Sequence, residues 1–423
     1  MREMKDSGVA WIGEIPKEWK ILPNKYLMKK EKSICESYNG EDILSLSMKG
    51  VVVRDLNSGG KMPLSFDGYQ YLKPGNLLMC LFDIDVTPRC IGLIRNNGLS
   101  SPAYSQFSLS NFAFNEYYYY YYLMLDNSKT LYHLAKNLRH SLTEEQLGMI
   151  STAVPPLSIQ HQIATYLDQK CTQIDALITN QQKQIEKLKA YKQNLITETV
   201  TKGLNPDVPM KDSGVEWIGK IPKDSKVTRA GHIYSIVLGK MLSPSPKQNS
   251  DTLEYYLCAA NVHFTGISYE PLKQMWFSEI EKQLYAVQCG DLLVVEGGAG
   301  AGGAAIVEES LNNYYIQNSI MIARPKGDVS NKWLYYSLYS LVKHNYIDFV
   351  CNKATIPHFT KDKLSKVPII IVKKEKETEI INYLDQKCTQ IDNLIAIKQQ
   401  KIEKLQQYKK SLIYEYVTGK KEI

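Results

Sequence analysis

The sequence predicts an α+β fold organised as an internal repeat. Two similar mixed α/β domains are each followed by a long helix, and the two helices are expected to form an antiparallel coiled coil. The ten residues 166–175, YLDQKCTQID, return unchanged at residues 383–392. A second motif, KDSGVAWIG at residues 5–13, returns as KDSGVEWIG at residues 211–219. Chance does not produce matches of this length, so the duplication sets the domain organisation.

The long helices carry the coiled-coil signal. In both copies, apolar residues recur every seven positions through a stretch without Pro or Gly. This spacing predicts a coiled-coil seam, and a polar residue, Gln181 or Lys398, interrupts it at the same place in each copy. The residues expected in the seam are Leu167, Ile174, Leu177, Leu188 and Leu195 in the first copy, and Leu384, Ile391, Leu394, Leu405 and Leu412 in the second.

Each seam needs a partner that buries it. The other copy in the same chain is the nearest partner, and association of two similar halves about a two-fold axis would set the helices antiparallel. The pattern is equally typical of a helix pair that serves only for oligomerisation.

Composition bounds the class of protein. The chain has 423 residues and a formal net charge of +7, which predicts two to four domains and permits a nucleic-acid partner without requiring one. No run approaches the roughly 18 apolar residues of a membrane span, and the first residues do not resemble a secretion signal. The eight cysteines are scattered without a Cys-x-x-Cys pair. We therefore expect a cytoplasmic protein with no membrane partner, no metal and no disulfides.

The repeat divides the chain into four parts. Each copy begins with a leading motif, residues 4–17 or 210–223, which Trp11 or Trp217 is expected to pack onto its domain. The predicted parts are 1–150 (leading motif and first mixed domain), 151–205 (first long helix), 206–372 (second leading motif and second mixed domain) and 373–423 (second long helix).

The two mixed domains are expected to share a fold. Their loops differ widely, whereas the leading motifs and long helices are nearly identical. This contrast suggests two equivalent domains that do the same kind of work on different targets. The corresponding predicted elements are strands 75–82 and 290–295, helices 115–137 and 331–338, and capped turns 143–147 and 360–364.

Motifs for nucleotide binding and catalysis are weak or missing. Gly298, Gly300 and Gly303 match the dinucleotide pattern G-x-G-x-x-G, but a strand rather than a helix is expected to follow them, which favours a hairpin loop. No G-x-x-x-x-G-K-[ST] loop is present, and the seven histidines are isolated. We expect no catalytic residues and no cofactor in this chain.

Six consecutive tyrosines, residues 117–122, permit a base-stacking platform. Consecutive helical residues point around the helix axis, so at most two or three of the rings share a face. Packing in the core, with some hydroxyls exposed, is therefore the favoured interpretation.

Basic residues in predicted loops are better candidates for contacts to DNA. Gathered on one face, they would contact phosphates, and a few of them would read base edges. Each alone is more typical of a solvated surface charge. The candidates are Lys49, Arg54, Lys61, Arg89, Arg95, Arg139 and His140 in the first domain, and Lys240, Lys247, His263, Lys353 and His358 in the second.

The order of leading motif, variable domain and long helix, present twice, resembles the specificity (S) subunit of type I restriction-modification enzymes. The pattern KDSGxxWIGxIP at residues 5–16 and 211–222 is similar to that family's, as is IATYLDQKxxQID at 163–175 with its second copy. The resemblance covers essentially the whole chain. The second copy departs from the pattern at Ser225, which stands where Trp19 stands in the first copy, and in the missing Pro-Pro pair before its long helix.

The resemblance implies a DNA-reading subunit without catalytic residues. In that family, each variable domain is a target recognition domain for one half of a bipartite, asymmetric site in double-stranded DNA. The coiled coil spaces the two domains and docks two methyltransferase (M) subunits, and two restriction (R) subunits complete the complex. S-adenosylmethionine, ATP and Mg²⁺ would belong to those partners, which methylate adenine N6 and cleave unmodified DNA in defence against phage.

Two other interpretations remain. A coiled-coil scaffold or adaptor protein would hold protein partners without reading DNA. An enzyme, such as a fused methyltransferase-nuclease, would need the motifs that are missing here.

Overall fold

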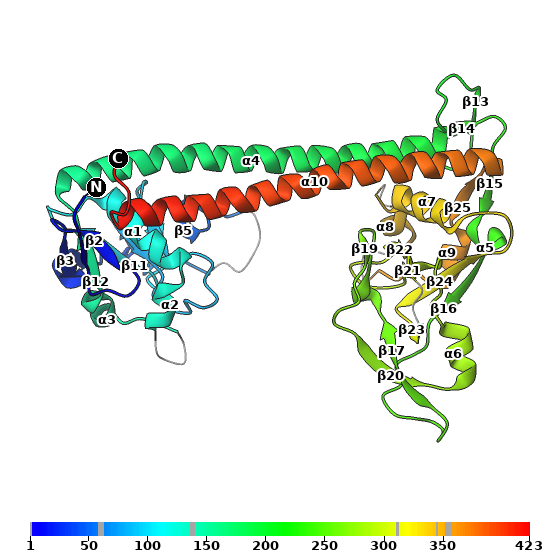
Figure 1. Cartoon of the computed structure of the whole chain (residues 1–423), viewed down its shortest axis with the longest axis horizontal. Coiled ribbons are helices and arrows are strands. Elements are labelled where there is room, and N and C mark those ends of the chain that lie inside the picture. Colours follow the sequence, from blue (N-terminus) through cyan, green and yellow to red (C-terminus); the bar gives the residue numbers. More distant parts are fainter. Residues whose placement is uncertain (1, 58–62, 136–139, 310–312, 344–345, 352–356) are drawn as a thin grey trace. The chain divides into compact units, whose positions relative to one another are not determined.

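The computed structural model describes residues 2–57, 63–135, 140–309, 313–343, 346–351 and 357–423. It confirms the predicted α+β repeat with two long helices, α4 (Leu157–Lys202) and α10 (Lys374–Val417) (Figure 1). The chain forms two compact units, and each unit contains part of both long helices. Unit 1 comprises residues 1–182 and 399–423, and unit 2 comprises residues 183–398.

Unit 1 holds the first leading motif and the first mixed domain. The leading motif is the β1–β2 hairpin, and the domain is built on an antiparallel sheet in the order β4-β11-β8-β9, with α1 against β9. Its strands are β1 (Met4–Asp6), β2 (Glu14–Pro16), β3 (Lys20–Pro23), β4 (Met28–Glu31), β5 (Leu44–Ser47), β6 (Gly50–Val53), β7 (Gln70–Leu72), β8 (Leu77–Met79), β9 (Ile91–Leu93), β10 (Gly98–Ser100), β11 (Ser105–Leu109) and β12 (Ser151–Val154). Its short helices are α1 (Asn115–Asn127), α2 (Thr130–Leu134) and α3 (Glu144–Met149).

Unit 2 repeats the leading hairpin (β13–β14) and the four-stranded sheet, but the segments between its sheet strands differ from those of unit 1. Its sheet has the order β16-β24-β21-β22, and α7 packs against three of those strands. Its strands are β13 (Met210–Asp212), β14 (Lys220–Pro222), β15 (Lys226–Arg229), β16 (Tyr234–Leu238), β17 (Thr252–Leu257), β18 (Val262–His263), β19 (Gly266–Ile267), β20 (Lys273–Phe277), β21 (Leu292–Val295), β22 (Ala304–Ile306), β23 (Tyr314–Ile316), β24 (Ile320–Pro325) and β25 (Pro368–Ile371). Its short helices are α5 (Ala230–Ile233), α6 (Glu279–Tyr285), α7 (Asn331–Lys343), α8 (Tyr346–Val350) and α9 (Lys361–Lys366).

The two domains share one frame, which confirms the expected common fold. The four sheet strands correspond in order, and the β3–β12 pair of unit 1 corresponds to the β15–β25 pair of unit 2. The same side chain joins helix and sheet in both: Asn115 donates from Nδ2 to the carbonyl oxygen of Gly75, and Asn331 donates to that of Gly290. Thr143 and Thr360 cap α3 and α9 at equivalent places. The frame is thus set by contacts that the duplication preserved.

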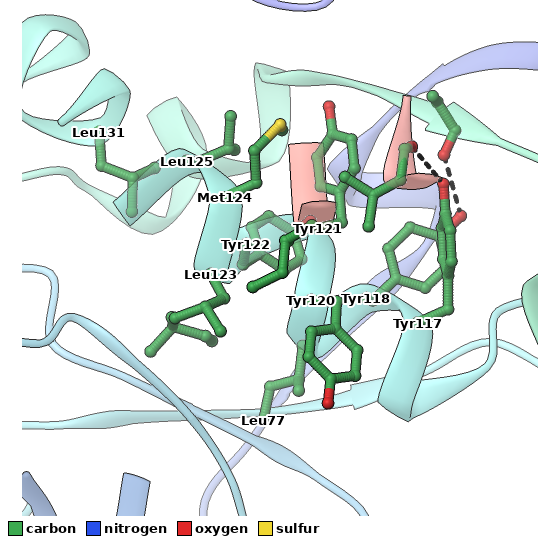
Figure 2. Close-up of a cluster of buried hydrophobic side chains, with 14 of the residues drawn as sticks. Leu77, Tyr117, Tyr118, Tyr120, Tyr121, Tyr122, Leu123, Met124, Leu125 and Leu131 are labelled. Atoms are coloured by element: carbon green, nitrogen blue, oxygen red, sulfur yellow. Dashed lines mark hydrogen bonds between the residues drawn. The ribbon is translucent and has the colours of Figure 1, made fainter. Parts of the chain in front are cut away.

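The run of tyrosines lies in the core of unit 1, as predicted. Tyr117, Tyr118, Tyr120, Tyr121 and Tyr122 are buried, and Figure 2 shows their rings pointing to different sides of α1. Tyr120 donates its hydroxyl proton to Asp168 Oδ1 of α4 at 2.6 Å. Burial and this hydrogen bond raise the pKa of Tyr120, because both disfavour the phenolate. The rings are therefore structural and do not form a base-stacking surface.

The same tyrosine–aspartate contact ties the domain of unit 2 to its long helix. Tyr336 of α7 donates to Asp385 Oδ1 of α10 at 2.6 Å. Tyr336 is the counterpart of Tyr120, and Asp385 is the counterpart of Asp168 in the repeated decapeptide. The near-identical helices are thus the docking surface for each domain as well as a coiled-coil pair.

Within each unit, α4 and α10 pair antiparallel. In unit 1, the tilted rings of Tyr166 and Tyr416 pack together with centroids 4.6 Å apart, and Asp175 accepts from Lys409 Nζ at 2.6 Å. As residue numbers rise along α4, the partner's numbers fall along α10, which defines the direction.

Unit 2 has the reciprocal ion pair, Lys192 Nζ to Asp392 Oδ2 at 2.6 Å. In the repeat, Lys192 corresponds to Lys409 and Asp392 to Asp175, so one contact is made twice. The polar interruption is satisfied there, because Lys398 Nζ donates to Gln184 Oε1 at 2.6 Å. Partly exposed pairs of this kind contribute little stability, about 1 kcal/mol or less each, and serve mainly to fix register.

The buried seam differs from the predicted one at its companion positions. Leu177 and Leu394 are 47% and 48% exposed, so they lie outside the seam of their units. A seven-residue repeat leaves open whether the companion comes three or four residues after the first position, and the four-residue choice holds: Ile178, not Leu177, packs with Ile174. Of the other predicted residues, Leu167, Ile174, Leu384, Ile391 and Leu412 are buried, and Leu188, Leu195 and Leu405 are half-buried.

The glycine-rich segment is a hairpin loop, as predicted. Gly298, Gly300 and Gly303 lie between β21 and β22, which pair antiparallel. A dinucleotide site would need a helix after the loop.

Each leading motif packs beside the end of a long helix. In unit 1, Gly419 follows α10 at a φ of +70°, and a Cβ there would lie 2.5 Å from Pro16 Cδ and 2.9 Å from Trp19 Cη2. In unit 2, Gly203 follows α4 at a φ of +80°, and nothing lies within 4 Å of its would-be Cβ. The two helix ends therefore share a conformation but not a packing environment.

We expect Gly419→Ala to destabilise the protein more than Gly203→Ala. At both sites a Cβ at positive φ costs about 1 kcal/mol. Overlap with Pro16 and Trp19 adds about 1–3 kcal/mol at residue 419 alone. Urea unfolding followed by circular dichroism measures both variants, and equal shifts of the midpoint would contradict the close packing at Gly419.

Candidate nucleic-acid interface

The two domains diverge between the first and second strands, in chain order, of the shared four-stranded sheet. In unit 1, residues 32–76 run from β4 to β8 and include the β5–β6 hairpin and β7. In unit 2, residues 239–291 run from β16 to β21 and include β17 to β20 and α6. We call these the divergent segments. Because the sheet strands on either side correspond, the divergent segments are two different insertions at one position of the fold.

In unit 1, three predicted DNA contacts come from neighbouring elements. Lys49 is exposed at the turn of the β5–β6 hairpin, and Arg54 follows β6. The hairpin packs on the sheet beside β9, where Val51 and Leu46 lie against Gly92. Arg95 is exposed two residues after β9. These side chains therefore form a group of cations on adjacent elements of one domain.

Two other predicted residues of unit 1 have structural contacts. Arg89 is mostly buried, and its Nη1 lies 3.2 Å from Asp126 Oδ2 of α1. It therefore ties the loop before β9 to α1, which makes it a poor candidate for a phosphate contact. His140 is half-buried, with its ring centroid 4.6 Å from that of Tyr132.

Lys240 of unit 2 is buried, which corrects its prediction as a DNA contact. Its side chain is 5% exposed, and Nζ donates to Glu281 Oε2 and to the carbonyl oxygen of Trp276, both at 2.6 Å. The Lys240–Glu281 ion pair therefore connects α6 to the loop that follows β16. The sequence alone shows a lysine in a loop, whereas its partner Glu281 is 41 residues further along the chain.

The remaining described candidates of unit 2 are at the surface. Lys247 is exposed in the divergent segment, and His263 is exposed in β18, with its Nε2 3.0 Å from the carbonyl oxygen of Ala260. His358 is exposed beside Glu296, with 3.3 Å between Nδ1 and Oε2. The last three predicted residues, Lys61, Arg139 and Lys353, lie outside the described residues.

Exposed apolar side chains accompany the cations in both divergent segments. Met48 and Val53 flank Lys49 in unit 1, and Met241 and Leu242 precede Lys247 in unit 2. Sequence analysis missed these residues because apolar residues are normally assigned to the core. Their signal lay in the neighbouring turn residues, such as Gly50 and Pro244, which keep a short apolar run at the surface. Apolar side chains at such places can contact thymine methyl groups.

Among residues 2–57, 63–135, 140–309, 313–343, 346–351 and 357–423, no group of three His, Cys, Asp or Glu side chains could hold a metal ion. No helix in the described part of the chain is long and apolar enough to cross a bilayer.

A family profile and two curated relatives point to the same protein family. The profile described as type I restriction modification DNA specificity domain matches residues 96–187 and 222–407. Over 292 residues the chain is 25% identical to the putative type I restriction enzyme MjaX specificity subunit of Methanocaldococcus jannaschii, covering 66% of this chain and 61% of the relative. It is 26% identical over 278 residues to the MjaVIII specificity subunit of the same organism, covering 64% and 62%.

Solved structures share the fold. A chain from a structure of complex assembly and conformational transition in the type I R-M system superposes with a TM-score of 0.70 at 14% identity, covering 95% of this chain and 98% of that one. The HsdS subunit from Thermoanaerobacter tengcongensis superposes with a TM-score of 0.51 at 14% identity, covering 96% and 98%.

We expect Lys49→Ala and Lys247→Ala each to weaken binding to any DNA duplex. A lost phosphate contact reduces the slope of log K against log salt by about 0.9, and affinity falls similarly across sequences. Fluorescence anisotropy on a mixed-sequence duplex at several salt concentrations measures both quantities. The matched controls are Lys20→Ala and Lys226→Ala, exposed lysines at equivalent places on β3 and β15. If the controls reduce the slope as much as the test variants, the divergent segments do not carry the interface.

Proposed function

Because the chain belongs to the type I restriction-modification specificity subunit family, we propose that each of its mixed domains reads one half of a bipartite, asymmetric DNA site. The internal duplication is the observation that supports this proposal. The frame is repeated down to individual hydrogen bonds, such as Asn115 to Gly75 and Asn331 to Gly290, whereas the inserted segments differ. Two readers with different surfaces on equivalent frames are suited to two different half-sites.

The chemistry of the divergent segments supports DNA reading. Exposed cations such as Lys49 and Lys247, with Arg95 beside the first segment, suit phosphates, which position a protein on the duplex. Exposed apolar residues such as Met48 and Met241 suit the thymine methyl group in the major groove. A surface that combines both types beside a rigid sheet is able to bind DNA and to discriminate between sequences.

We assign this chain no catalytic step. Methylation and cleavage would be performed by two methyltransferase (M) and two restriction (R) subunits, which would hold S-adenosylmethionine, ATP and Mg²⁺. The alignments span 61% and 62% of the two curated relatives, and the activity of a complete complex is part of the proposal. Such a complex would act in the cytoplasm, where the DNA is.

The long helices would space the two readers and dock the M subunits. Each unit exposes the same pair of apolar residues on its helices, Leu177 and Tyr408 in unit 1 and Leu394 and Tyr191 in unit 2. Leu177 corresponds to Leu394 and Tyr191 to Tyr408 in the repeat. Exposed leucine and tyrosine preserved at equivalent positions indicate two equivalent protein contacts.

The methylome of a host without adenine methylation tests the reading function. We expect co-expression of this chain with an M subunit from the same genome to produce one new motif. It should contain two short, different blocks that flank an unread gap, with N6-methyladenine in each block. The M subunit expressed alone is the control and should leave the DNA unmethylated.

A soluble complex with the M subunit that methylates nothing and binds DNA no better than the M subunit alone would overturn the proposal. It would favour the coiled-coil scaffold or adaptor, the second candidate function, which needs partners but no DNA. A motif with two identical blocks would contradict the assignment of different half-sites to the two domains.

We expect Leu177→Lys combined with Leu394→Lys to weaken binding to the M subunit by tenfold or more. Both residues are about half exposed, so the fold should be retained, whereas a cation in an apolar protein contact costs about 1–2 kcal/mol or more per site. Isothermal titration calorimetry with purified M subunit measures the loss, and DNA binding should be unchanged.

Glu186→Lys with Glu403→Lys is the matched control, since it places the same new side chains at exposed, equivalent positions half a turn from the leucine face. If control and test variants bind the M subunit equally well, docking does not use Leu177 and Leu394.

A further inference from the structure

Unit 2 contains a cavity beneath its leading motif, at the place where unit 1 holds the buried side chain of Trp19. It has a volume of about 260 Å³ and opens between the end of α4, β14, β25 and the first turns of α10. Its apolar lining includes Val200, Pro222, Ile370 and Ile380, with Ser225 among the lining residues.

In unit 1, a tryptophan side chain fills the equivalent space. Ser225 is the counterpart of Trp19, which is 1% exposed in unit 1. The two residues are held by the same backbone contact, because the N–H of Trp19 donates to the carbonyl oxygen of Pro16 at 3.0 Å and that of Ser225 to Pro222 at 2.9 Å. Replacement of an indole by a hydroxymethyl group at one backbone position accounts for the cavity.

The neighbours of the two positions differ accordingly. In unit 1, Gly419 and Pro16 close upon the Trp19 ring, and the guanidinium of Arg2 lies 5.5 Å from the ring centroid. In unit 2, Gly203 faces open space, and Val208 stands where the repeat places Arg2. In unit 2 the contacts that enclose the indole of unit 1 are therefore not made, and the space beside Ser225 is left open.

The walls of the cavity do not depend on an occupant. Val200, Ile370 and Ile380 are buried parts of the core of unit 2, which also holds Trp333 and Phe359. Collapse would need α10 or β25 to move, yet β25 is paired with β15 along its length. A cavity whose apolar walls are held in this way stays open and can bind an apolar ring; a fully apolar engineered cavity of about 150 Å³ in another protein binds benzene.

We propose that this cavity is a binding site for a small planar aromatic molecule of indole size. Its volume lies just below the roughly 300–1,000 Å³ of sites for drug-sized ligands, which suits one or two fused rings and excludes a peptide segment. Thr201, Asn205 and Glu379 line it as well and supply acceptors for a ring N–H. The site is separate from the divergent segments, and the inference does not depend on DNA reading.

Titration of the full chain with indole tests the proposal. We expect one saturable site with a dissociation constant at or below about 1 mM, measured by calorimetry or by fluorine NMR of 5-fluoroindole. Ser225→Trp should fill the cavity, abolish binding and raise the melting temperature. Ser225→Ala keeps the cavity and should bind indole like the natural chain. Trp19→Ser should open the equivalent space in unit 1 and add a second site.

The comparison of Ser225→Trp with Ser225→Ala decides the question, since both change the same residue and only one fills the space. Absence of saturable binding to the folded natural chain at several millimolar indole would overturn the proposal. So would binding that Ser225→Trp leaves unchanged, because the ring would then occupy another part of the molecule.

Discussion

The burial of one helix seam against its own duplicate is the constraint on which the rest of the structure depends. Neither long helix can hide its apolar face alone, and each finds its partner in the other copy. The reciprocal pairs Lys192–Asp392 and Lys409–Asp175 exist because the two sequences are nearly the same and run in opposite directions. Each helix must also dock a domain through a tyrosine–aspartate hydrogen bond. A residue in this stretch therefore contributes to two contact surfaces, and a substitution there would affect both.

The divergent segments escape this constraint because they are inserted between strands of a sheet that is complete without them. In unit 1, β4 and β8 both pair with β11, so the length and sequence of residues 32–76 hardly affect the sheet. In unit 2, β16 and β21 both pair with β24 in the same way. Insertions at such a place tolerate change, since the cost of closing a longer loop grows only slowly with its length. Within one domain, the inserted segment can therefore change while the four-stranded sheet stays the same.

The sequence predicted the repeat, the shared fold and the helix direction because these follow from identity between two stretches and from a seven-residue period. It predicted less well what depends on contacts distant in sequence. Whether Leu177 or Ile178 joins the seam depends on a choice between three- and four-residue spacing that the seven-residue period leaves open. Lys240 looked like a free loop cation because Glu281, its partner, belongs to an element that only the folded chain brings near. Met241 and Leu242 were missed because nothing local distinguishes an apolar residue held at the surface from one in the core.

The core of unit 1 is closed by the last part of the chain. Leu412, Ile413, Tyr416 and Val417 belong to the same apolar cluster as Leu167 and Ile174, and Tyr117 donates its hydroxyl proton to the carbonyl oxygen of Val417. On the ribosome, the first unit therefore cannot complete its core when its own domain emerges; it must wait for residues 183–398 to be made. Contacts of such high sequence separation slow folding and prolong the exposure of unpaired apolar surface. During synthesis, the apolar face of α4 would stay unpaired until α10 has been made. We therefore expect chaperones to bind the nascent chain.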